Sequence, residues 1–78
     1  MSQASTFANG LRAAWRREMW TAHTYRVLAK RETNASRRDV LLKLAANERD
    51  HAARWSSRLK ELRIELPPYF DFGIRTAE

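Results

Sequence analysis

The chain has 78 residues, of which 44% are hydrophobic and 31% are charged, and its formal net charge is +6 at pH 7. This length is near the lower limit for one self-sufficient core, and the composition is typical of a folded chain. Because the sequence contains no cysteine, disulfide bonds and thiolate metal sites are excluded. A metal would need oxygen and imidazole ligands, which favours iron or manganese over structural zinc.

The two glycines and two prolines leave few breaks, so the sequence predicts an all-α protein. No apolar run approaches the roughly 20 residues of a membrane span, which indicates a soluble chain. The 15 lysines and arginines are spread along the sequence and mostly fall off the apolar stripes, as on solvated helix faces. Nucleic-acid binding is therefore not expected, and anionic lipid headgroups fit the basic charge better.

A first helix is predicted from about Ser5 or Thr6 to about Arg31, although Asn9 before Gly10 is an alternative cap for a later start. At about 100° per residue, one stripe of this helix is apolar except at its centre. The stripe comprises Phe7, Leu11, Ala14, Glu18, Ala22, Tyr25 and Ala29. Its single charged residue is Glu18, so the first helix places a carboxylate on the face that should be buried.

The segment Thr33–Ser36 interrupts the periodicity and predicts a loop. Ser36 followed by Asp39 resembles a capping box, so a second helix is expected from about Arg37 to about Arg63. Its apolar stripe comprises Leu41, Leu44, Glu48, His51, Trp55, Leu59 and Leu62. An acid and an imidazole one turn apart on an apolar stripe are costly to bury unless a partner meets them.

Two long amphipathic helices joined by a short loop predict an antiparallel hairpin. Thr33, in the predicted loop, is equally far in sequence from Glu18 and from Glu48. At about 1.5 Å per residue, both carboxylates should lie roughly 22 Å from the turn and therefore at the same level. The only polar residues of the two stripes are thus expected to meet.

Pro67 and Pro68 end any helical pattern, and the residues after them are expected to be extended. The sequence is therefore divided into a helical hairpin over residues 1–66 and an extended C-terminal tail over residues 67–78. No internal repeat or low-complexity segment is evident.

The set Glu18, Tyr25, Glu48 and His51 on two long helices resembles the ferritin-like superfamily of rubrerythrin type. The resemblance covers roughly residues 5–63. It is closest to two-helix versions, namely encapsulated ferritins and the N-terminal ferritin-like domain of some vacuolar-iron-transporter-family membrane proteins. It implies that Glu18, Glu48 and His51 ligate a di-iron centre that oxidises Fe(II), with manganese as the other metal to consider. Tyr25 would have a supporting or redox-active role beside that centre.

The resemblance also implies a homodimer that completes a four-helix bundle, with the metal site at its interface and iron as the substrate; higher oligomers are left open. A membrane transporter domain following the tail, and a cytoplasmic location at the face of a membrane, are further expectations. Two alternatives stay open. The buried acids could set helix register in a metal-free dimerisation or sensor module, or the chain could be a basic nucleic-acid-binding hairpin.

Overall fold

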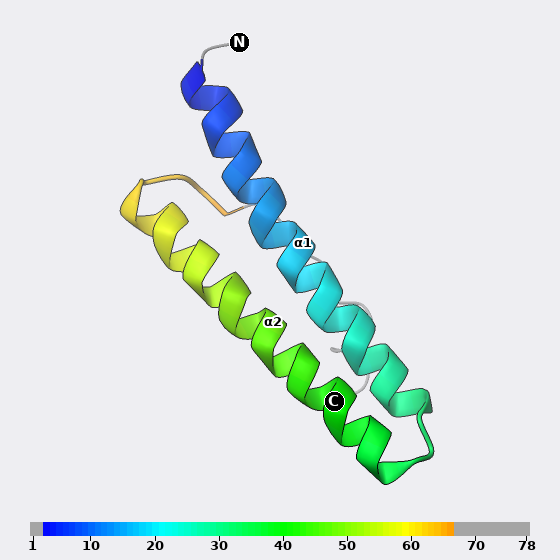
Figure 1. Ribbon diagram of the computed structural model, residues 1–78. Coiled ribbons are helices and arrows are strands. Elements are labelled where there is room, and N and C mark those ends of the chain that lie inside the picture. Colours follow the sequence, from blue (N-terminus) through cyan, green and yellow to red (C-terminus); the bar gives the residue numbers. More distant parts are fainter. Residues whose placement is uncertain (1–2, 67–78) are drawn as a thin grey trace.

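A computed structural model describes residues 3–66 and shows two long α-helices packed side by side in antiparallel directions (Figure 1). Helix α1 spans Gln3–Arg31 and helix α2 spans Ala35–Glu61. The predicted all-α hairpin is therefore confirmed. Neither helix, over the residues that the structure describes, is long and apolar enough to cross a membrane. The tail predicted over residues 67–78 lies outside the described residues.

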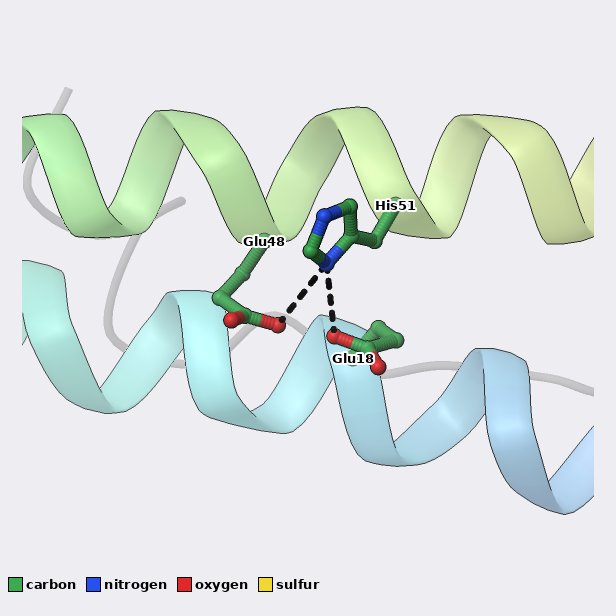
Figure 2. Close-up of side chains that lie close together, drawn as sticks. All are labelled: Glu18, Glu48 and His51. Carbon is green, nitrogen blue, oxygen red and sulfur yellow. Dashed lines mark ion pairs between the residues drawn. The ribbon is translucent and has the colours of Figure 1, made fainter.

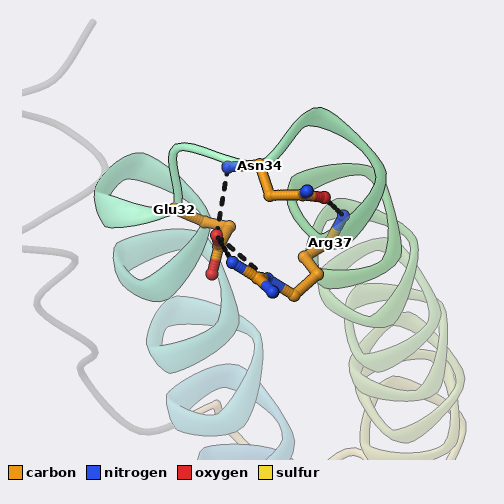
Figure 3. A network of polar contacts seen from close by, with 3 residues as sticks. All are labelled: Glu32, Asn34 and Arg37. Atoms are coloured by element: carbon orange, nitrogen blue, oxygen red, sulfur yellow. Dashed lines mark hydrogen bonds and ion pairs between the residues drawn. The ribbon is translucent and has the colours of Figure 1, made fainter.

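The loop is shorter than predicted, because Asn34 rather than Ser36 caps the second helix (Figure 3). Asn34 has an extended backbone, with φ −81° and ψ 122°, and its side-chain oxygen accepts a hydrogen bond from the Arg37 backbone N–H at 3.0 Å. The carboxylate of Glu32 accepts bonds from the Asn34 N–H and the Arg37 guanidinium. This network starts α2 at Ala35, so the predicted cap at Ser36 was wrong.

The contact between the two helices is formed mainly by alanine. The buried residues of α1 and α2 are Ala14, Trp15, Ala22, Ala29, Ala45, Ala52 and Leu59. Trp15, Ala22 and Ala29 follow one another at intervals of seven residues, as do Ala45, Ala52 and Leu59, which is the heptad spacing of coiled coils. Small side chains at most of these positions let the two backbones approach closely. We call these seven residues the seam. They are the core of the hairpin.

The seam occupies only one edge of the predicted stripe of α2. Leu59 is buried, but Leu44 is only half-buried and His51 is exposed. The expectation that His51 faces a buried core is therefore wrong for a single hairpin. The reason is the alanine edge formed by Ala45 and Ala52, which permits a closer approach of α1 than the bulkier neighbouring positions would.

After α2 the chain turns back toward α1. The Ile64 N–H bonds to the Leu59 carbonyl and the Arg63 N–H to the Lys60 carbonyl, the two bonds of a Schellman cap. Arg63 adopts a left-handed φ of 58°. The turn packs Ile64 against the seam, and the Arg12 guanidinium holds the Glu65 carbonyl at 2.9 Å. The open end of the hairpin is closed in this way.

Candidate metal centre

Glu18 of α1 and the pair Glu48 and His51 of α2 converge halfway along the hairpin (Figure 2). The Nδ1 atom of His51 lies 3.7 Å from a carboxylate oxygen of Glu18 and 3.7 Å from one of Glu48. One ligand atom from each of the three residues lies within 4.8 Å of the other two. The structure thus brings together the three residues that the sequence predicted to share one level.

The register of the two helices determines where these three residues lie. Glu18 lies one turn from both Trp15 and Ala22 of the seam, and Glu48 lies between Ala45 and Ala52 in the same way. Both carboxylates therefore start at the seam and point toward the same open side of the hairpin. His51 is one turn after Glu48 on that side, so its ring reaches both acids.

The carboxyl group of Glu18 changes the pKa of Glu48. The pKa of Glu48 is raised above its ordinary value, first because its carboxyl hydrogen-bonds with that of Glu18, and further because of desolvation and the charge of Glu18. His51 acts in the opposite direction. The side chains of both acids are 22% exposed, whereas that of His51 is 48% exposed. Positive charge between the two acids would relieve this repulsion.

The remaining predicted residue is not brought into the group. Tyr25 is half-buried on α1, about two turns from Glu18 toward the loop. It does not line the hollow that contains Glu18 and His51. A role for Tyr25 beside the site therefore stays a prediction.

Two arginines that the sequence analysis did not select lie beside the group. A hollow of about 370 Å³ is lined by Glu18, His51, Arg54, Trp55 and Arg58. Arg54 and Arg58 follow His51 by one and two turns, so their spacing on α2 was the available signal. The Arg58 guanidinium also pairs with the Glu61 carboxylate at 3.1 Å. Both arginines lower the net negative charge near the two acids.

Exposed apolar side chains flank the group on the same side of the hairpin. At about 100° per residue, the positions that share this side with the acids and His51 include four large hydrophobic residues. These are Phe7, Leu28, Val40 and Leu62, all of them exposed. We call this side, with the three polar residues at its centre, the open face. Apolar surface of this extent around a polar cluster indicates an interaction site.

Comparison with known protein families, with curated proteins and with solved structures found no match to this chain. The function is therefore inferred from the geometry of the site.

Proposed function

We propose that two copies of this chain pair through their open faces to form a ferritin-like four-helix bundle, which binds two iron ions and oxidises Fe(II) to Fe(III). The observation that carries the proposal is the convergence of Glu18, Glu48 and His51 from two helices, with ligand atoms within 4.8 Å. Manganese is the other metal that this ligand set suits.

The donor atoms fit such ions. Carboxylate oxygens and an imidazole nitrogen are ligands that iron and manganese accept, whereas a structural zinc site usually contains thiolates. The Nδ1 atom of His51 already points between the two acids, at 3.7 Å from each (Figure 2). The pKa of Glu48 is raised by its hydrogen bond with Glu18 and by desolvation, and a divalent cation would take the place of the proton that this favours.

The number of ligands that one hairpin offers favours a dimer. One hairpin supplies one Glu from α1 and one Glu-x-x-His from α2, and a ferritin-like dimetal site needs two of each. A two-fold axis through the site would present Glu18, Glu48 and His51 twice. If this axis is perpendicular to the helices, it would bring the Phe7 and Leu62 end of one copy against the Leu28 end of the other. The exposed apolar residues and the incomplete ligand set thus favour the same partner.

In this proposal the residues of the site have different roles. Glu18, Glu48 and His51 of each chain would hold the ions, and the two Glu48 carboxylates would supply negative charge to both of them. Iron would be the substrate: two Fe(II) would together give two electrons either to dioxygen, which with two protons becomes hydrogen peroxide, or to hydrogen peroxide, which with two protons becomes two waters. The apolar residues of the open face exclude water, so the charges of the acids act strongly on the ions.

A metal-free register device is the second candidate, and a specific observation favours it. The Nδ1 atom of His51 lies 3.7 Å from a carboxylate oxygen of Glu18 and 3.7 Å from one of Glu48, so a protonated His51 would pair with both acids. A protonated His51 would offset part of the carboxylate repulsion and hold the two helices in register. The two candidates differ in what an added metal does.

The test is a titration of chelator-treated protein with Fe(II) under anaerobic conditions, and separately with Mn(II). We expect one ion per chain, hence two per dimer, and a higher melting temperature. Metal at 100 times its Kd should add about 2.7 kcal/mol to the stability. Glu48→Ala should abolish this gain, whereas Asp50→Ala, which removes an exposed acid nearby on α2, should retain it. An unchanged melting temperature with both metals would favour the register device.

A further inference from the structure

A second surface of the hairpin lies on the outward side of α1, away from α2. Ala13, Arg16, Arg17 and Trp20 are all exposed and line a shallow hollow of about 370 Å³. Trp20 is 59% exposed. We call these four residues the outer patch. Their spacing of three, four and seven residues puts them next to one another on the helix surface.

The proposed dimer leaves most of the outer patch uncovered, and only Arg17, about 20° from Leu28 around α1, lies at the border of the open face. The seam residues of α1, among them Trp15 and Ala22, face α2, and the open face lies on one side of that contact. At about 100° per residue, Ala13 and Trp20 point away from the seam and from the open face. A large exposed indole thus remains without an explanation from either the hairpin or its pairing.

The patch has strong positive charge. Glu18 is the only acid of α1, and it belongs to the candidate metal centre. Within residues 3–66, neither Arg16 nor Arg17 forms an ion pair with a carboxylate. The Trp20 ring lies against the His23 ring, with centroids 5.5 Å apart and planes tilted by 39°, which holds the indole in place. The patch is a positioned indole beside two guanidinium groups without acidic partners.

We infer that the outer patch binds an acidic segment of a partner protein. One apolar side chain of that segment would lie on Ala13 against the face of Trp20, and carboxylates on either side would pair with Arg16 and Arg17. Guanidinium groups recognise carboxylates through two parallel hydrogen bonds. Trp and Arg are also the residues that most often dominate the binding energy of protein interfaces.

Two other anionic partners fit the patch less well. A helix that lies on a lipid bilayer needs an apolar stripe along its length, but on the outward side Trp20 is followed by Thr24 and Arg31, with only the half-buried Val27 between them. A nucleic acid needs a continuous row of basic residues, but Arg31 lies about 21 Å beyond Arg17 along the helix. The hollow and its two arginines match a single side chain with neighbouring acids.

The experiment uses the full chain labelled with ¹⁵N and a capped synthetic peptide, Glu-Glu-Leu-Glu-Glu-Leu-Glu-Glu, titrated to millimolar concentration. We expect chemical-shift changes at the Trp20 indole N–H and at the backbone amides from Ala13 to Trp20. Trp20→Ala, and the double variant Arg16→Gln with Arg17→Gln, should each weaken binding at least tenfold. The control Arg31→Gln should change it less than twofold, and Glu48→Ala should leave it unchanged, because the patch is separate from the metal centre.

Control ligands decide between the classes of partner. A peptide of the same charge with glutamine in place of both leucines should bind at least tenfold more weakly. The inference is overturned if that peptide binds equally well, or if no shifts occur at the outer patch. It is also overturned if phosphatidylglycerol vesicles or single-stranded DNA of equal charge bind the patch more tightly than the leucine-containing peptide.

Discussion

The seam and the open face lie on neighbouring edges of the same two helices, yet they differ in composition and in burial. Five of the seven seam residues are alanine and the seam is closed, with Ala22 1% and Ala52 2% exposed. The open face has large side chains and is uncovered, with Phe7 57% and Val40 56% exposed. Apart from Trp15 and Leu59, the hairpin therefore buries alanines and leaves several large apolar side chains exposed for another contact.

The residues that hold the hairpin together are different from the residues of the candidate metal centre. None of the residues of the candidate metal centre is buried in the seam, so the hairpin does not need them for its core. The two acids instead lie together on the open face, where a hydrogen bond with Glu18, desolvation and the charge of Glu18 raise the pKa of Glu48 and so disfavour its charged form. A residue arrangement that weakens the isolated hairpin is more easily explained by a ligand or a partner than by folding.

The largest effect should come from damage to the seam. Leu59 is the only large side chain that is fully buried among the described residues. Leu59→Ala should lower the free energy of unfolding by about 2–5 kcal/mol, because a cavity replaces its contacts with Trp15 and Ala52. Leu42→Ala, at an exposed position of α2, should change it by less than about 0.5 kcal/mol. Urea unfolding followed by circular dichroism measures both, and equal losses would refute the assigned core.

The second effect concerns the open face. Val40→Lys should weaken pairing of the chains, since a two-fold interface contains the substituted residue twice. A loss of about 1.5 kcal/mol for each copy would raise the dimer dissociation constant more than about 100-fold. Leu42→Lys puts the same charge elsewhere on α2 and should have little effect. Sedimentation over a range of concentrations distinguishes them, and a wild-type monomer that binds iron tightly would contradict the shared site.

The sequence was sufficient for the hairpin, because helical periodicity and the break near Thr33 are local signals. It also predicted that Glu18 would meet Glu48 and His51, because equal distances from a loop fix the heights of residues in an antiparallel pair. It did not predict which edge of each stripe would be buried. That choice depends on how closely two backbones approach, which alanines such as Ala45 and Ala52 decide only when both helices are present.

The loop was predicted with the wrong cap for a related reason. Ser36 and Asp39 match a capping box, but Asn34 is an equally good cap, and the choice depends on Glu32 and Arg37. The side chains of Glu32 and Arg37 form an ion pair across the loop (Figure 3). A capping motif does not include such a contact, because it describes only the cap residue and the three residues after it. The roles of Arg54 and Arg58 were missed because arginine on a helix usually indicates a solvated surface.

The third effect should come from the loop between α1 and α2. This loop sets the register of the two helices, and therefore which residues meet in the seam and on the open face. Asn34→Ala removes the acceptor for the Arg37 N–H and should lower the free energy of unfolding by about 1 kcal/mol. Ser36→Ala, at the position that the sequence favoured, should change it by only a few tenths of that amount. Thermal unfolding of both variants measures the difference. A larger loss for Ser36→Ala would mean that α2 begins later than Ala35.

The smallest effect is a difference in pH dependence between the open face and the loop, measured on metal-free protein in chelator. The pKa of Glu48 is raised by its hydrogen bond with Glu18, so its contribution to stability is complete below its ordinary value of 4.5 and is lost as the pH rises through the folded-state pKa. The pKa of Glu32 is lowered by its hydrogen bonds with Arg37 and Asn34, so its contribution is present above 4.5 and is lost as the pH falls. The two carboxylates should therefore act with opposite signs.

Replacement of each acid by glutamine tests the sign of its contribution to the pH dependence of stability. Glu48→Gln should unfold at higher urea concentration than the wild type at pH 7, and this advantage should shrink toward pH 4, where the wild-type carboxyl is itself protonated. Glu32→Gln should be less stable than the wild type at pH 7, and that deficit should shrink toward pH 4. Both groups are near solvent, so added salt should reduce both differences. If Glu48→Gln follows the wild type at every pH, the two acids do not share a site, and the electrostatic reason for a bound cation is lost.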